Sequence, residues 1–263
     1  MLKQAVRRTG LTRRRVSSVR VCCERKLMAR LFPAEPARSR ILCYHSVGTE
    51  SWGHNDVSPG RFARHIDLAL EAGYRFVPAD LIASDVDSDN HRLAITFDDG
   101  LRSVALNAAP VLASYGIPWT IFVVSNWADG DHNFGDGVML SWDEIESLAS
   151  QGATIGSHSV SHPNFGGLSA PLAEQELDES RLTIAARTGI VPNSFAIPFG
   201  QSKDWTPEAR AAASRAGYQF VYAQAEETRA DGTIPRTFVT RYDSDRVFRA
   251  ALGGVFDRWE EWT

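Results

Sequence analysis

The chain has 263 residues, enough for one large domain or two small ones, and its apolar (43%) and charged (23%) fractions are those of a globular protein. The formal net charge of −4 is unevenly spread: residues 1–40 carry 12 basic and two acidic side chains, and the remainder carries 16 basic and 30 acidic ones. An acidic main domain argues against nucleic acid as its substrate. Three cysteines are too few for a disulfide framework, and no stretch approaches the roughly 20 apolar residues of a membrane span.

Residues 1–40 form a basic N-terminal arm. An apolar stripe with helical spacing runs through it, made of Val16, Val19, Cys23, Leu27 and Leu31. Such a segment is predicted either to be disordered or to lie as a helix on an anionic membrane surface; a transit peptide and a chain starting at Met28 are further alternatives. Because no apolar core follows the basic residues, no secretory signal is recognised, and we expect a protein that is cytoplasmic or peripheral to the inner membrane face.

From residue 41 onward, strand-like and helix-like segments alternate. The predicted strands are 41–47, 74–77, 93–97, 119–124, 153–157, 194–197, 219–222 and 237–240. Caps, prolines and glycines bound predicted helices at 58–73, 105–115, 141–152, 169–189, 206–217 and 243–252. Repeated strand–helix units predict an α/β fold, an irregular (β/α)7-type barrel of parallel strands that forms a single catalytic domain over residues 41–263. Barrels of this kind place their chemistry at the C-terminal ends of the strands.

Two acids and two histidines follow predicted strands. Asp98 and Asp99 come directly after 93–97, and His158 and His162 come after 153–157. One carboxylate and two imidazoles hold a divalent cation and leave a position open for water, whose pKa falls to roughly 7 there, while the second carboxylate remains as a base. A helical turn would bring the two histidines onto one face. A plain turn at Asp-Asp-Gly and capping or exposed histidines are the structural alternatives.

These motifs resemble the polysaccharide deacetylase family, also called the NodB homology domain, over most of residues 41–263. The resemblance rests on TFDDG at 96–100, HSVSH at 158–162 with a proline after it, LSWDEI at 140–145 and FAIPFG at 195–200. It implies a hydrolase that removes acetyl groups from N-acetylated sugars, with Asp98 as general base and Asp99, His158 and His162 as metal ligands. The expected ion is Zn²⁺, with Co²⁺, Ni²⁺ and Mn²⁺ as alternatives.

The chain departs from the family pattern twice. Many members carry an arginine in the third motif that braces the base, where this chain has Ala196, and a histidine in a last motif, whereas no histidine follows the HSVSH segment here. Pro198 and Phe199 complete the third motif, and the backbone N–H of Phe199 is expected to stabilise the oxyanion. Arg236 and Arg241 are candidates for the bracing role, and the sequence does not choose between them.

The missing acid is expected at the other end of the chain. The first and last strands of a closed barrel are neighbours, so a residue can change chain ends without moving far in space. Tyr44-His45 at the first strand resembles the circularly permuted poly-N-acetylglucosamine deacetylases, which makes His45 the expected general acid; a core histidine is the alternative.

The predicted function is therefore metal-dependent removal of N-acetyl groups from N-acetylglucosamine-containing glycans or lipid-linked sugars. An O-acetyl esterase acting on carbohydrate and a non-catalytic glycan-binding protein are the alternatives.

Overall fold

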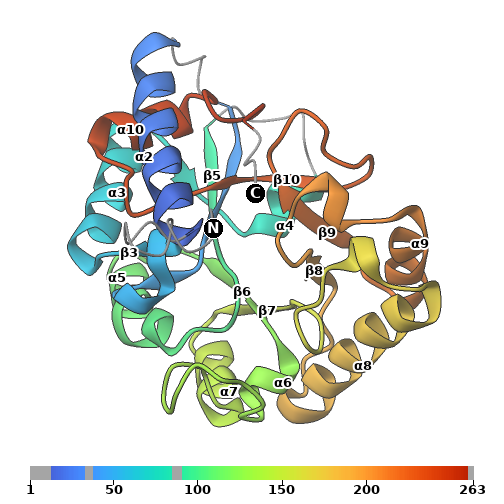
Figure 1. Ribbon diagram of the computed structural model, residues 1–263. Coiled ribbons are helices and arrows are strands. Elements are labelled where there is room, and N and C mark those ends of the chain that lie inside the picture. Colours follow the sequence, from blue (N-terminus) through green and yellow to red (C-terminus); the bar gives the residue numbers. More distant parts are fainter. Residues whose placement is uncertain (1–12, 33–37, 85–90, 260–263) are drawn as a thin grey trace, which may run out of the picture.

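The computed structural model describes residues 13–32, 38–84 and 91–259, and its centre is a closed barrel of parallel strands (Figure 1). The strands follow the order β1-β10-β9-β8-β7-β6-β5, and β5 pairs again with β1 to close the ring. They are β1 (Arg40–Tyr44), β5 (Arg92–Phe97), β6 (Trp119–Val123), β7 (Thr154–Ser157), β8 (Ser194–Ala196), β9 (Phe220–Gln224) and β10 (Ile234–Phe238). The predicted (β/α)7-type barrel is confirmed.

Most residues of the barrel strands are apolar because both faces of the strands are covered. Every residue of β1 and β5 is buried, and the two strands pair in register from Arg40–Leu93 to Tyr44–Phe97. Three short strands lie outside the ring: β4 (Arg75–Phe76), which pairs with the start of β5, and β2 (Ser46–Val47) with β3 (Asp56–Val57), which pair with each other. β10 begins before the predicted start at residue 237, and this shift brings Arg236 into the strand.

Helices surround the barrel on its outer side (Figure 1). They are α3 (Pro59–Glu71), α5 (Ala109–Ser114), α6 (Ser125–Ala128), α7 (Trp142–Ser150), α8 (Ala170–Thr188), α9 (Pro207–Ala216) and α10 (Asp245–Leu252). The predicted caps are present: Ser141 and Glu144 form a capping box on α7, and left-handed glycines end α8 and α9. The predicted helix at 105–115 is divided into a π-helical turn, η2 (Val104–Ala108), and α5.

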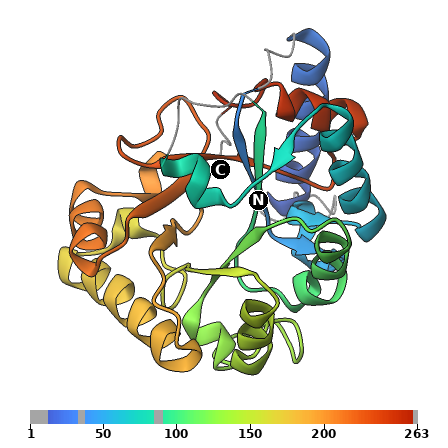
Figure 2. The ribbon, with the colours of Figure 1, turned by 180° about the vertical axis from the view of Figure 1, so that it is seen from behind.

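Apolar side chains fill the barrel interior and close its N-terminal end. Phe122 and Tyr222 are buried in the interior, with ring centroids 5.3 Å apart, and the Arg236 guanidinium lies over both rings. Ile82 of α4 (Ala79–Ser84) belongs to the same cluster, and α4 follows β4, which pairs with the first residues of β5 (Figure 2). With this end filled, the opposite end, where the strands finish, is free for a pocket.

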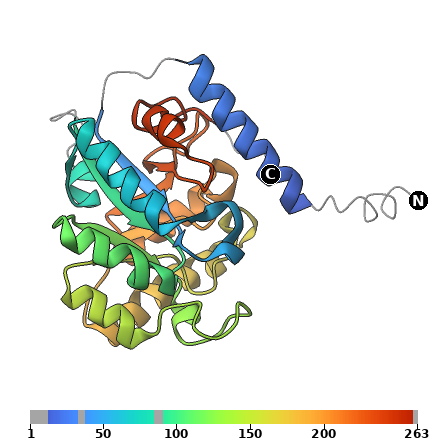
Figure 3. The same cartoon turned by 90° about the vertical axis from the view of Figure 1, so that its left-hand side faces the viewer.

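The helix α2 (Arg13–Leu31) lies along the outside of the barrel against α10 (Figure 3). Its inward side buries Val21, Arg25 and Ala29, and Arg25 donates hydrogen bonds of 2.8 and 2.6 Å to the two carboxylate oxygens of Asp243. In the structure, residues 13–31 form a helix that a buried partner from the far end of the chain holds against the barrel. Residues 1–12 and 33–37 of the predicted arm lie outside the described residues. No described helix has both the length and the apolar character needed to cross a membrane.

Candidate active site

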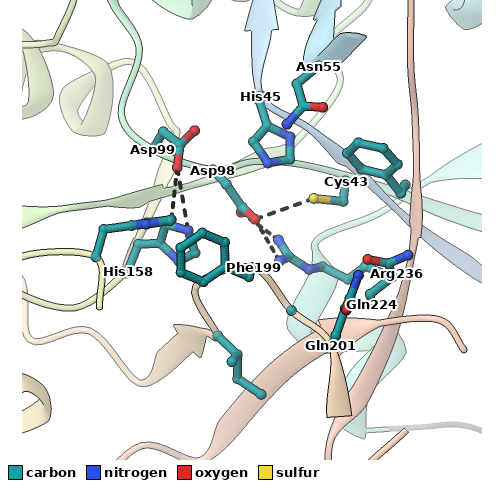
Figure 4. A pocket seen from close by; sticks show the side chains of 14 residues that line it. Cys43, His45, Asn55, Asp98, Asp99, His158, Phe199, Gln201, Gln224 and Arg236 are labelled. Carbon is teal, nitrogen blue, oxygen red and sulfur yellow. Dashed lines mark hydrogen bonds and ion pairs between the residues drawn. The ribbon is translucent and has the colours of Figure 1, made fainter. Parts of the chain in front are cut away.

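The predicted site residues come together at the C-terminal end of the barrel, in one pocket of about 280 Å³ (Figure 4). His45 follows β1, Asp98 and Asp99 follow β5, His158 follows β7 and Phe199 follows β8. His162 also lines the pocket, and Pro198 is buried next to Phe199 without lining it. Parallel strands therefore deliver to one place residues that are far apart in the sequence.

The backbone at this end of the barrel is unusual. Only four non-glycine residues of the described chain have a positive φ, and all lie here: Asp99 (73°), Ser159 (72°), His162 (59°) and Phe199 (66°). Each such conformation costs on the order of 1–3 kcal/mol and persists only where surrounding structure enforces it. Three of the four are predicted site residues, so the chain is bent where it presents functional groups.

The two histidines are carried by an irregular loop, and the predicted helical turn between them is wrong. Glu176 of α8 accepts hydrogen bonds from the backbone N–H groups of Val160 (2.9 Å) and Ser161 (3.0 Å). The Ser159 hydroxyl accepts from the backbone N–H of His162 at 2.9 Å. These side-chain acceptors satisfy the backbone that a helix would have satisfied internally, and they turn the loop back towards the pocket.

Asp99, His158 and His162 have the geometry of a metal site. Asp99 Oδ1 lies 3.6 Å from Nε2 of His158 and 3.5 Å from Nε2 of His162. Ligands bonded to zinc at about 2.0–2.1 Å in a tetrahedral arrangement are about 3.4 Å apart, so these atoms are spaced to share one ion.

Both histidines are in the state that binds metals. Burial lowers the pKa of His158 to about 3 and also lowers the pKa of His162, so both rings are neutral at neutral pH. The Nδ1–H of His158 donates to the carbonyl of Ala196 at 2.8 Å, which leaves its Nε2 lone pair directed at Asp99. A carboxylate and two neutral imidazoles therefore fit a divalent cation.

Asp98 is held by one of the two arginines between which the sequence did not choose. Arg236 of β10 donates to both carboxylate oxygens, at 2.6 and 2.7 Å, and both residues are buried. Burial by itself would raise the pKa of Asp98, but the Arg236 charge and its hydrogen bonds lower it, so the carboxylate is ionised. The guanidinium of Arg241, the other candidate, instead donates to the carbonyl of Gly53 at 3.3 Å on an exposed part of the surface. Arg236 thus occupies the bracing role left open by Ala196.

His45 lines the same pocket, and its Nδ1 is buried without a hydrogen-bond partner among the described residues. Burial lowers its pKa, against the opposing charges of Asp99 and Asp98. Cys43, His45 and Asp98 are also close enough to offer ligand atoms to one ion. Both oxygens of Asp98 are already engaged by Arg236, however, so this second group is the poorer metal site.

Comparisons with known proteins agree with this geometry. The profile of the polysaccharide deacetylase family matches residues 85–221, and the chain belongs to that family. Among curated proteins, it is 26% identical over 189 residues to YxkH of Bacillus subtilis, a protein named for this family; the match covers 70% of this chain and 64% of YxkH. It is 25% identical over 137 residues to the peptidoglycan-N-acetylglucosamine deacetylase PgdA of Listeria monocytogenes, covering 51% of this chain and 27% of PgdA. The chain thus spans less than two thirds of the length of either relative.

Solved structures share the fold. The deacetylase PplD of Streptococcus pyogenes superposes with a TM-score of 0.70 at 20% identity, covering 82% of this chain and 99% of PplD. IcaB of Ammonifex degensii superposes with a TM-score of 0.69 at 23% identity, covering 83% of this chain and 98% of IcaB. At these identities the likeness concerns the fold, and the chemistry is argued from the residues of this chain.

Proposed function

We propose that this protein is a metal-dependent deacetylase that hydrolyses the N-acetyl groups of N-acetylglucosamine-containing glycans or lipid-linked sugars. The observation that carries the proposal is the placement, in one pocket, of a three-ligand group (Asp99, His158 and His162) beside an ionised Asp98 braced by Arg236. Zn²⁺ is the proposed ion, because carboxylate and neutral imidazole at this spacing suit it. Co²⁺, Ni²⁺ and Mn²⁺ accept the same ligands, so metal content is to be measured and not assumed.

The reaction divides its work among residues of the pocket. A divalent cation at the three-ligand group supplies Lewis acidity and makes water a better nucleophile at neutral pH. Asp98 takes the proton from the attacking water, and the backbone N–H of Phe199 donates to the oxygen that develops negative charge. His45 gives a proton to the departing nitrogen, which leaves a free amino sugar and acetate. The side chain of Phe199 is 58% exposed, so a glycan can reach it from solvent.

Acetate release from N-acetylglucosamine oligomers tests the proposal, measured with added Zn²⁺, with a chelator, and with Asp98→Asn. Loss of a positioned base typically costs 10²–10⁴-fold, so Asp98→Asn is expected to lower turnover by about that factor while zinc content stays the same. Hydrolysis of acetyl esters without amide hydrolysis would identify an O-acetyl esterase. Sugar affinity and bound metal without release from either substrate would identify a glycan-binding protein.

The role of His45 has its own test. His45→Ala is expected to lower turnover of amide substrates by about 10²–10⁴-fold with normal zinc content, because a poor leaving amine needs its proton. Acetyl esters should lose less, since an alcohol leaves more easily. His91→Ala, outside the pocket, is the control. Full amide turnover by His45→Ala would remove the residue from the mechanism.

We also propose that α2 holds the enzyme at an anionic membrane surface, near lipid-linked sugars. Its outward residues Val19, Leu27 and Leu31 are 64%, 56% and 63% exposed, and the exposed side chains of Lys26 and Arg30 lie among them. An apolar stripe bordered by positive charge suits a membrane that carries negative lipids. The first turns of α2 lie on the same side of the barrel as η1 (Glu50–Asn55), which belongs to the catalytic end (Figure 3).

Vesicle flotation of the full chain tests this surface. Deleting α2 would also remove buried Arg25, so point substitutions are cleaner. Lys26→Gln with Arg30→Gln should weaken binding to phosphatidylglycerol vesicles by about fivefold per charge. Leu27→Gln with Leu31→Gln should weaken it as well, whereas the equally exposed leucines of α8 serve as the control pair, Leu172→Gln with Leu182→Gln. Equal recovery with neutral phosphatidylcholine vesicles would contradict the proposal.

A further inference from the structure

One carboxylate oxygen of the candidate metal ligand Asp99 accepts a hydrogen bond from a tryptophan. The indole N–H of Trp52, in η1, donates to Asp99 Oδ2 at 3.0 Å, whereas Asp99 Oδ1 faces the two histidines. The Asp99 side chain is buried. Its backbone is left-handed and lies beyond the end of β5, so regular strand geometry does not fix the direction of the side chain. The indole therefore sets which carboxylate oxygen points at the metal position.

Trp52 is itself held by a chain of aromatic contacts that leads back to a second ligand. Its ring centroid is 4.9 Å from that of Phe134, which is 5.0 Å from Trp127. Trp127 stacks on His162 at 5.2 Å with 25° between the planes. We call Trp52, Phe134 and Trp127 the aromatic arc. It joins η1 to α6 and the loop that follows α6, and its two ends contact Asp99 and His162.

We propose that Trp52 is a positioning residue of the metal site, which fixes Asp99 as a one-oxygen ligand, and that the aromatic arc keeps Trp52 in place. Ligand carboxylates are commonly oriented by a hydrogen bond to their second oxygen, and loss of such a partner weakens metal affinity by about 10–100-fold. The inference rests on the metal site of the proposed function but not on which substrate is hydrolysed.

The decisive variant is Trp52→Phe in the full chain, which deletes the indole N–H and keeps an aromatic ring against Phe134. Zinc affinity, measured by competition with a chromophoric chelator, is expected to fall by about 10–100-fold. Acetate release at limiting zinc should fall with the zinc affinity and should rise as zinc is added, because Asp98 and Arg236 are untouched. The melting temperature of the zinc-free protein should be unchanged.

A matched control exists in the same chain. The indole N–H of Trp142 donates to Asp129 Oδ1 at 2.8 Å on an exposed part of the surface, so Trp142→Phe removes the same kind of bond away from the metal position. Its zinc affinity should equal that of the wild type. Phe134→Leu breaks the aromatic arc without touching a ligand and should weaken zinc binding less than Trp52→Phe does.

Two results would overturn the role of Trp52: unchanged zinc affinity in Trp52→Phe, or an equal loss in Trp142→Phe. Unchanged affinity in Phe134→Leu would overturn the role of the aromatic arc. Failure of the proposed function is separately visible. A wild-type protein that binds zinc but releases no acetate would refute the deacetylase and leave the role of Trp52 intact. A wild-type protein that binds no zinc would refute both.

Discussion

Two buried arginine–aspartate pairs each join distant elements of this chain. They differ in whether the aspartate lines the active-site pocket. Arg236 and Asp98 join β10 to β5 at 2.6 and 2.7 Å, and Asp98 lines the pocket. Arg25 and Asp243 join α2 to the turn before α10 at 2.8 and 2.6 Å, and Asp243 also accepts a hydrogen bond from the Thr240 hydroxyl. Neither Arg25 nor Asp243 lines the active-site pocket.

The same pairing therefore serves two purposes. Next to the pocket, Arg236 keeps the Asp98 carboxylate, the proposed base, ionised and fixed in direction, so the pair sets a protonation state. Beside α2, Arg25 stacks on Phe256 at 4.1 Å and fastens a helix to the barrel. The two pairs have the same chemistry, and they differ in whether the carboxylate lines the pocket.

The largest effect is expected from Arg236→Met. Removing one partner leaves Asp98 buried and uncompensated, which typically costs about 3–5 kcal/mol of stability, and its pKa rises. Deacetylation should fall by about 10²–10⁴-fold, and the acid limb of the kcat/KM–pH profile should move to higher pH because Asp98 now protonates more readily. An acid limb at its wild-type position would show that Arg236 does not control this carboxylate.

Arg25→Met makes the same substitution in the other pair. The free energy of unfolding, from denaturant titration, should fall by about 3–5 kcal/mol, while kcat per folded molecule stays the same. A loss of kcat comparable with that of Arg236→Met would break the distinction between the two pairs.

A smaller, pH-dependent effect is expected from His65, which connects the Arg25 pair to the barrel. Its Nε2 contacts the carbonyl of Asp243 at 3.0 Å, its Nδ1 contacts the Tyr44 hydroxyl at 3.1 Å, and its ring stacks on Phe248. Burial lowers the pKa of His65 from 6.5 to about 4. The unfolded chain therefore binds a proton that the folded chain does not, and about 3 kcal/mol of stability is lost as the pH falls from 6.5 to 4.

Denaturant titrations of zinc-loaded protein between pH 4 and 7 measure this loss. His65→Gln should be less stable at pH 7 but should show a shallower decline towards pH 4. The control is His132→Gln, on a surface loop, whose decline should parallel that of the wild type. An identical slope for His65→Gln would place the pH dependence elsewhere.

Much of the fold and part of the site were predictable. The positions of most strands and helices, the helix caps and the barrel class follow from local patterns, because hydrophobic periodicity and capping act over a few residues. The failure at the site has a partly tertiary cause: the loop from His158 to His162 looked like a helical turn, but Glu176 of α8 and Ser159 satisfy its backbone in another way.

The sequence by itself determined which side chains supply the candidate chemistry, since Asp98, Asp99, His158 and His162 follow predicted strands that must end at one face of a parallel barrel. Only the tertiary structure decided their partners. Arg236 is 138 residues from Asp98, and Arg25 is 218 residues from Asp243. Trp52 reaches Asp99 from another loop. Such pairings depend on how the barrel closes, and no local sequence pattern predicts which distant side chain will contact a buried charge.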